Sequence, residues 1–118
     1  MRYFFILPQL VYLIFTTSSC LATDMEEIDY LLNFIGESGC TFIRNGKEYP
    51  SEQAREHLSY KYNHVKSRIR TAELFIEKIA SQSSISKKPY QVRCNSDLLQ
   101  SRDWLMAALR IYRTRAVK

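Results

Sequence analysis

The side chains of this sequence with the clearest chemical potential are five polar residues grouped around a predicted turn. They are Arg44, Asn45, His57, Lys61 and Tyr90. Arg44 lies beside the turn, and His57 and Lys61 are one helical turn apart, so short connections should keep these groups close. A guanidinium and an ammonium beside an aromatic ring suit an anion or a sugar. These five residues are therefore a candidate ligand-binding site.

A purely structural interpretation of the same residues is simpler, and the sequence alone favours it. In that interpretation Asn45 forms the turn, Arg44 pairs with a carboxylate such as Glu73, and Tyr90 packs with its hydroxyl hydrogen-bonded. Asparagine is common in such turns because it tolerates positive φ. The two interpretations differ in whether these groups face a pocket open to solvent or bond only to one another.

A metal site has little support. His57 and His64 lie seven residues apart on one predicted helix and share a face. A zinc site needs three or four ligands, however, and neither Glu52 nor Glu56 completes a known spacing. The sequence contains no HExxH or CxxC pattern. We therefore expect no metal and no cofactor, with His57 at the edge of the core and His64 facing solvent.

Nucleophilic catalysis has one candidate arrangement, in which Ser83 or Ser84 pairs with His57. No GxSxG elbow supports it, and serines in loops mostly form turns. The cysteines are not expected to serve as nucleophiles, because we expect them to be oxidised. The sequence favours a non-enzymatic binding or interaction module, and a hydrolase acting on an envelope polymer is the alternative.

Residues 1–22 have the pattern of a cleavable signal peptide. Arg2 is followed by an apolar run at 3–15 and then by small and polar residues. That run is too short for a membrane-spanning helix, which needs about 20 residues. A membrane anchor and a buried core helix are the alternatives. We expect an exported, periplasmic protein in which residues 23–118 form a single small globular domain.

The cysteines follow from this processing. Cys20 and Ala22 are the small residues expected before a cleavage site, so we expect the cut after Ala22. Removal of Cys20 leaves Cys40 and Cys94, an even pair in an oxidising compartment, and we expect a disulfide between them. Two unrelated buried thiols are the alternative. Cys20 is also a candidate lipidation site, which would make the protein a membrane-anchored lipoprotein.

Helices are predicted from the spacing of apolar residues. Ile28, Leu31, Leu32 and Ile35 follow the i, i+3, i+4, i+7 pattern of an amphipathic helix, which Gly36 ends. Three further helices are predicted to start at hydroxyl residues suited to the N-cap position: Ser51, Thr71 and Ser101. Whether residues 51–81 form two helices or one bent helix stays open.

Strands are predicted in two places. Residues 40–49 have the pattern of a β-hairpin, because Asn45 and Gly46 suit the two positions that need positive φ. Residues 89–94 predict a third short strand, which the expected disulfide would place near the hairpin. The fold class is therefore α+β, with about four helices, a two- or three-stranded antiparallel sheet and one disulfide.

The charge of the chain indicates the kind of partner. Arg2 is the one charged residue in the predicted signal peptide, so its removal lowers the formal net charge from +5 by one unit. A mild positive charge suits an anionic envelope component, such as lipid head groups or an envelope polymer. Another envelope protein is the alternative partner. Nucleic acid is a poor partner for an exported protein, and the tyrosines form no stacking array.

Several short motifs are spread along the chain. They are Phe42-Ile43-Arg44-Asn45-Gly46, His57-Leu58 with Lys61, Thr71-Ala72-Glu73 with Phe75-Ile76, Ala80-Ser81, Ser83-Ser84 and Pro89-Tyr90. In this order and spacing they resemble a family of small secreted bacterial proteins known as a domain of unknown function, the YfeK-like proteins. The resemblance runs from about residue 26 to residue 112. It implies an envelope protein of a Gram-negative bacterium, and it implies no catalytic role for any residue.

Overall fold

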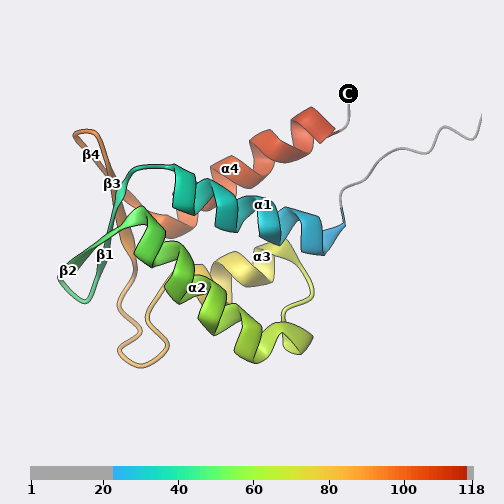
Figure 1. Ribbon diagram of the computed structural model, residues 1–118, viewed down its shortest axis with the longest axis horizontal. Helices are drawn as coiled ribbons and strands as arrows, with labels where there is room; N and C mark the ends of the chain where they lie inside the picture. Colours follow the sequence, from blue (N-terminus) through green and yellow to red (C-terminus); the bar gives the residue numbers. More distant parts are fainter. Residues whose placement is uncertain (1–22, 117–118) are drawn as a thin grey trace, which may run out of the picture.

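The computed structural model of the protein describes residues 23–116 (Figure 1). The predicted signal peptide, with the candidate lipidation site Cys20, lies outside the described residues. The described chain forms four α-helices and four β-strands. In chain order they are α1 (Asp24–Glu37), β1 (Thr41–Arg44), β2 (Lys47–Pro50), α2 (Ser51–Val65), α3 (Ala72–Phe75), β3 (Gln91–Cys94), β4 (Asp97–Gln100) and α4 (Ser101–Ala116).

The predicted α+β class is confirmed, but the sheet has one strand more than expected. The four strands are antiparallel and lie in the order β2-β1-β3-β4. The unpredicted strand is β4, which pairs with β3 after a turn at Asn95, where φ is +57°. Its four residues lack the β-branched and aromatic side chains that favour strands, so the pairing with β3 has to determine it.

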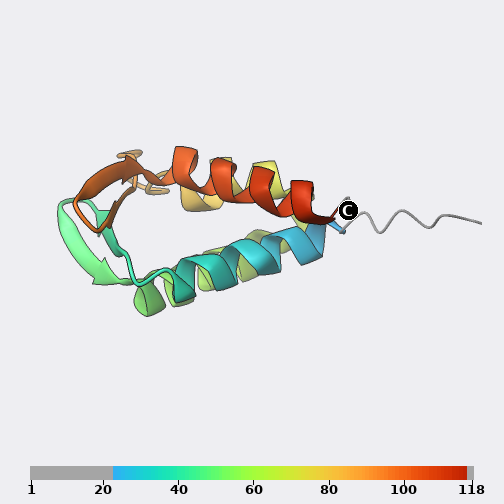
Figure 2. The same ribbon diagram turned by 90° about the horizontal axis from the view of Figure 1, so that it is seen from above.

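The helices form two layers, and the sheet lies across one end of both (Figures 1 and 2). One layer contains α1 and α2, and the other contains α3 and α4. The core between the layers includes the predicted stripe of α1, whose residues Ile28, Leu31, Leu32 and Ile35 are all buried. Phe42 of β1 and Val92 of β3 face each other in the register and close the core at the sheet end.

Residues 51–81 form two helical segments, which settles the question that the sequence left open. After α2, a 3-10 turn at Lys66–Arg68 leads to Ile69, whose backbone is extended with ψ at 89°. Thr71 then caps α3 as predicted, because its Oγ1 accepts from the Leu74 amide at 3.1 Å. A π-helical turn, Ile76–Ala80, continues α3 to the loop before β3.

Two of the three predicted caps are wrong. Ser51 is the first residue of α2, and its hydroxyl donates to the Gly36 carbonyl at 3.1 Å. Ser101 is the first residue of α4, and its hydroxyl donates to the Ala80 carbonyl at 2.9 Å. Both hydroxyls are buried at contacts between elements, so they satisfy a carbonyl of another helix instead of an amide of their own.

Three further contacts hold the described chain together. The predicted disulfide is confirmed, with the Cys40 and Cys94 sulfurs 2.06 Å apart beside the paired strands β1 and β3. Arg113 on α4 binds the carboxylate of the buried Glu27 on α1. Thr23 opens α1 with a capping box, in which its hydroxyl accepts from the Glu26 amide at 3.2 Å.

Candidate ligand-binding site

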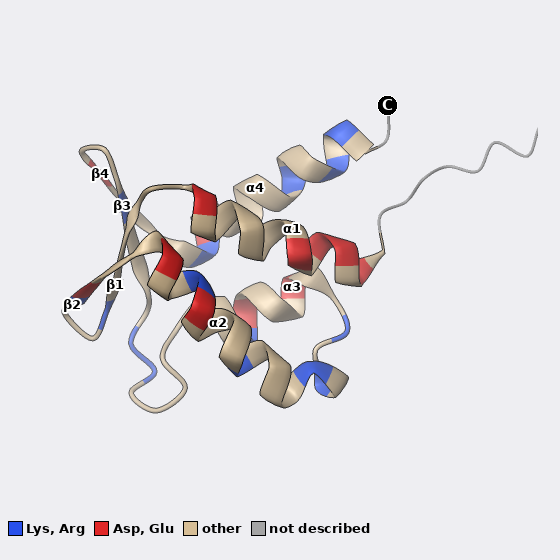
Figure 3. Ribbon diagram, viewed as in Figure 1, with Lys and Arg blue, Asp and Glu red and all other residues tan. Residues whose placement is uncertain are grey.

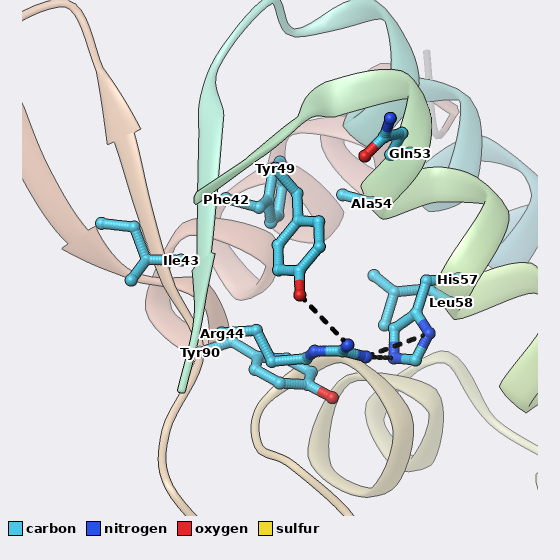
Figure 4. Close-up of a pocket in the computed structure, with 9 residues that line it drawn as sticks. All are labelled: Phe42, Ile43, Arg44, Tyr49, Gln53, Ala54, His57, Leu58 and Tyr90. Carbon is cyan, nitrogen blue, oxygen red and sulfur yellow. Dashed lines mark hydrogen bonds between the residues drawn. The ribbon is translucent and has the colours of Figure 1, made fainter. Parts of the chain in front are cut away.

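A pocket of about 170 Å³ lies between the β1–β2 hairpin and α2 (Figure 4). The direct passage from β2 into α2 places the hairpin against the first turns of the helix. The pocket has apolar and aromatic walls with a few polar groups. It is lined by Phe42, Ile43, Arg44, Tyr49, Gln53, Ala54, His57, Leu58 and Tyr90. Three of the five predicted site residues are therefore in its lining.

Arg44 is the central polar group of the pocket. Its Nη1 lies 2.6 Å from Nε2 of His57 and 3.2 Å from Nδ1, and its Nη2 donates to the Tyr49 hydroxyl at 3.3 Å (Figure 4). The guanidinium carbon is 5.1 Å from the centre of the Tyr49 ring. Because arginine has five N–H donors, these contacts fix the plane of the guanidinium and still leave donors for another group.

His57 is an acceptor in this arrangement, since an arginine can only donate. Burial lowers the pKa of His57 below its usual range, and the positive charges of Arg44 and Lys61 lower it further. At neutral pH the imidazole is therefore uncharged, with an unprotonated ring nitrogen available to Arg44. The prediction that His57 lies at the edge of the core agrees with its partial burial.

Lys61 lies one turn further along α2, beneath Tyr90. Its Nζ donates to the Ile79 carbonyl at 3.0 Å, to the Tyr90 hydroxyl at 3.1 Å and to the Gln82 carbonyl at 3.5 Å. The pKa of Lys61 is lowered to about 8, chiefly by burial and in addition by the charges of Arg44 and Lys87. Lys61 thus contributes positive charge to the region, while its three N–H groups bind oxygens of the protein.

Tyr90 forms the wall between the pocket and Lys61. The side chain is buried, and burial raises the pKa of its phenol, an effect that the Arg44 charge opposes. Its hydroxyl is hydrogen-bonded, as the structural interpretation expected. The ring lies at the rim of the loop between the π-helical turn and β3, so this loop helps to shape the pocket.

The expected pairing of Arg44 with Glu73 is wrong. Glu73 lies on α3, where its carboxylate is 2.5 Å from Nη1 of Arg113. Within residues 23–116, no carboxylate lies in ion-pair distance of Arg44 or Lys61. The local field is positive, because the charges that shift the pKa values of His57 and Lys61 come from Arg44, Lys61 and Lys87 and none from a carboxylate of the described residues. Lys87, in the loop before β3, adds to it through its effect on Lys61. The loop before β3 carries basic residues and no acidic ones (Figure 3).

Asn45 is exposed, whereas the other four predicted site residues are partly or fully buried. It forms the hairpin turn with φ at +51°, followed by Gly46 at +78°, as the sequence predicted. Its Oδ1 accepts from the Ser86 hydroxyl at 2.7 Å, which ties the turn to the loop before β3. Asn45 is exposed and is absent from the lining of this pocket.

The residues considered for a metal site or for nucleophilic catalysis do not form such a site. His64 is exposed, as expected, and its Nδ1 is 3.0 Å from the Tyr60 carbonyl. In the described part of the chain, no hydrogen bond joins His57 to Ser83 or Ser84; the Ser83 hydroxyl accepts from the Ser86 amide. No three His, Cys, Asp or Glu side chains within the same range are arranged to hold a metal ion.

Several lining residues were missed by the sequence analysis, although their spacing carries a signal. Phe42 and Arg44 are two apart on one strand and so face the same side of the sheet. The Asn45-Gly46 turn fixes the register that places Tyr49 opposite Phe42. Ala54 and Leu58, four apart on α2, share the face of His57. Reading the hairpin register together with the helix face would have identified this set.

Between residues 23 and 116, no helix combines the length and the apolar character that are needed to cross a bilayer.

Comparison with known proteins supports the resemblance seen in the motifs. Residues 22–113 match a family of unknown function, DUF5329. Over 70 residues the chain is 43% identical to the uncharacterized protein YfeK of Salmonella typhimurium, a match that covers 58% of this chain and 58% of that protein. No solved structure matches the chain. The expected likeness to YfeK-like proteins is thus confirmed.

Proposed function

Because this chain belongs to DUF5329, a family of unknown function, we propose its role from its geometry: it is a non-enzymatic module that binds an anionic group at Arg44. The observation that carries the proposal is a pair of partly buried cations, Arg44 and Lys61, with no carboxylate beside them among residues 23–116. Buried charges in proteins are normally paired, so an anion in the pocket would supply the missing partner.

The electrostatics of the pocket support an anion over a neutral ligand. The lowered pKa values of His57 and Lys61 express the cost of adding positive charge at this place. A bound anion would offset that cost and raise both pKa values. Arg44 is held by His57 and Tyr49, so little side-chain entropy would be lost when a ligand binds.

A binding role agrees better with these contacts than catalysis does. Both ring nitrogens of His57 lie within hydrogen-bond distance of Arg44, and within the described residues His57 has no hydrogen bond to a serine. A general base needs a nucleophile within hydrogen-bond reach, either directly or through one water. The polar groups of the pocket hold one another in place, which suits recognition.

We place the protein outside the cytoplasm, in the periplasm of a Gram-negative bacterium. The signal-peptide pattern of residues 1–22 supports this location, and so does the disulfide between Cys40 and Cys94, since disulfides persist in oxidising compartments. The ligand would then be an anionic component of the envelope, or an acidic group on another envelope protein. A lipoprotein anchored through Cys20 would present the same pocket from a membrane surface.

The proposal is tested by titrating the exported, processed protein with acetate and with inorganic phosphate while following backbone amide shifts by NMR. The expected result is a saturable shift for at least one anion at the amides of the hairpin and of α2. Arg44→Gln should abolish it. Arg93→Gln is the matched control, because Arg93 pairs with Glu48 on the exposed face of the sheet. Absence of any anion binding, or equal binding by the Arg44 variant, would overturn the proposal.

A further inference from the structure

We infer that the pocket recognises a carboxylate attached to a single apolar group no larger than a six-membered ring. This inference rests on the proposed function and names its ligand class. Two sources supply such chemistry: a free aromatic or branched carboxylic acid, and the terminal residue of a peptide with its free carboxylate. The argument depends on the volume of the pocket, the nature of its walls and the number of free donors.

The volume limits the size of the bound group. Sites for drug-sized ligands enclose about 300–1,000 Å³, whereas a cavity of about 150 Å³ holds one benzene molecule. At about 170 Å³, this pocket has room for one ring or one branched alkyl group. A larger ligand would therefore place one group inside the pocket and leave the rest of itself in solvent.

The walls select an apolar group. Phe42, Ala54 and Leu58 are buried lining residues, and the Tyr49 and Tyr90 rings close two further sides (Figure 4). A sugar hydroxyl placed against these walls would lose its hydrogen bonds to water without replacement. An aromatic ring or an alkyl group would instead gain contact with apolar walls and be removed from water itself.

The donors select a carboxylate over a phosphate. The Lys61 ammonium directs its three N–H groups to the oxygens of Ile79, Gln82 and Tyr90, so it offers charge to the pocket without a free donor. Among the lining residues, Arg44 is the one permanent cation, and its five N–H groups exceed the contacts it makes with His57 and Tyr49. The planar geometry of a guanidinium matches the two oxygens of one carboxylate. A phosphate dianion has three terminal oxygens and a second charge, which one guanidinium does not satisfy.

The test compares four small probes on the exported protein by NMR titration: benzoate, acetate, inorganic phosphate and benzyl alcohol. Benzoate is expected to bind at least about tenfold more tightly than acetate, because only benzoate fills the apolar part of the pocket. Benzyl alcohol has the ring without the charge and should bind at least about tenfold more weakly than benzoate. Arg44→Gln should reduce benzoate affinity to that of benzyl alcohol, and Arg93→Gln should leave it unchanged.

A filled-pocket variant separates the ring from the charge. Ala54→Val should weaken benzoate while leaving acetate binding in place, since Arg44 is untouched; Ala107→Val, at an exposed position of α4, is the control for folding. If phosphate or acetate binds as tightly as benzoate, this inference fails and the proposed function stands. If benzyl alcohol matches benzoate, the carboxylate assignment fails. If none of the anions binds, both fail.

The two sources are distinguished by a second pair of probes, N-acetyl-phenylalanine and N-acetyl-phenylalanine amide. Binding of the acid at or above the strength of benzoate, with no binding of the amide, assigns the site to a peptide terminus. Binding of benzoate alone assigns it to free carboxylic acids, because the acetylated backbone is then excluded at the mouth of the pocket. Equal binding of acid and amide would show that the carboxylate is not recognised and would overturn the inference.

Discussion

Arg113, near the end of α4, donates two hydrogen bonds to the carboxylate of Glu27 on α1. Its Nε lies 2.7 Å from Oε2, and its Nη2 lies 3.0 Å from Oε1. The two residues are 86 positions apart, so this contact joins the last helix to the first. Glu27 is buried, and Arg113 also lies 2.5 Å from Glu73 on α3. One guanidinium therefore links three helices on the side of the core away from the sheet.

Replacement of Glu27 should destabilise the protein more than replacement of an exposed acid. Glu27→Ala removes two charge-assisted hydrogen bonds and should lower the free energy of unfolding by about 2 kcal/mol. The control is Glu77→Ala, because Glu77 is exposed and 3.6 Å from Arg102, and exposed pairs contribute at most about 1 kcal/mol. Urea unfolding followed by circular dichroism measures both. Equal losses would contradict a special role for the Arg113 contact.

Reduction of the disulfide should have a larger effect. Cys40 and Cys94 close a loop with a sequence separation of 54, which the chain-entropy relation values at about 4 kcal/mol. The double variant Cys40→Ala with Cys94→Ala should therefore show a much lower urea midpoint than the oxidised protein. Addition of reductant should lower the midpoint of the natural protein and leave that of the double variant unchanged. A midpoint insensitive to reductant in both proteins would refute this expectation.

Lys61 should make stability rise with pH in the alkaline range. Its pKa is about 8 in the folded protein and near 10.5 when the chain is unfolded, so the unfolded chain binds the proton more tightly. The resulting destabilisation is fully present below pH 8 and is relieved as the pH rises towards 10.5. Solvent screening at this half-buried position keeps the effect small.

Urea unfolding at pH 7.5, 8.5 and 9.5 measures this dependence on Lys61. The natural protein should gain stability with pH relative to Lys61→Met, whose unfolding lacks this proton. Lys78→Met is the matched control, because Lys78 is exposed on the π-helical turn and should leave the pH dependence as it is. If Lys61→Met and the natural protein change in parallel, the lowered pKa is wrong.

Lys87 occupies a backbone conformation that favours glycine. Its φ is +61°, in the left-handed region, where a side chain costs about 1 kcal/mol. Lys87→Gly should therefore raise the free energy of unfolding by up to about 1 kcal/mol. Lys88→Gly makes the same change of charge at a neighbouring residue without positive φ and should give no gain. Thermal unfolding of the two variants compares them, and a lower melting temperature for Lys87→Gly would disprove the prediction.

Mass spectrometry of the N-terminus tests whether the protein is exported and how it is processed. We expect cleavage after Ala22, so that Thr23 is the first residue. A diacylglyceryl group on Cys20 would instead identify a lipoprotein. A chain that retains Met1 would contradict both forms of export. Cys20→Ser is a useful control, because it blocks lipidation and should not affect cleavage after Ala22.

The sequence predicted those parts of the fold that depend on local pattern. Apolar residues three and four apart located the helices, and Asn45-Gly46 located the hairpin, because each signal is carried by neighbouring residues. β4 was missed because Asp97–Gln100 has weak strand propensity and pairs with β3 through the turn at Asn95. Ser51 and Ser101 were misassigned as caps because their hydroxyls bond to distant helices.

The site followed the same division. The sequence placed Arg44, His57 and Tyr90 in one group, and all three line the pocket. A direct passage from β2 to α2 brings Arg44 and His57 together, whereas Tyr90 arrives through the pairing of β3 with β1. It did not identify Tyr49 as a partner of Arg44, which depends on strand register, and it wrongly paired Arg44 with Glu73. That error arose because the partner of Glu73 is Arg113, from the opposite end of the chain. Packing of the helices determines which distant charged residues form ion pairs, and these pairs cannot be predicted from a single sequence.

The capping box at Thr23 would give the predicted cleavage after Ala22 a consequence for the stability of α1. Its backbone nitrogen is 3.4 Å from the Glu26 carboxylate. A cut after Ala22 would turn that nitrogen into a charged terminal amine. Its hydrogen bond to Glu26 would become an ion pair, which would stabilise the first turn of α1. Loss of one further residue would remove the cap, at about 1 kcal/mol. An aminopeptidase would thus meet a terminus that is already folded, and trimming would have to begin by unwinding α1.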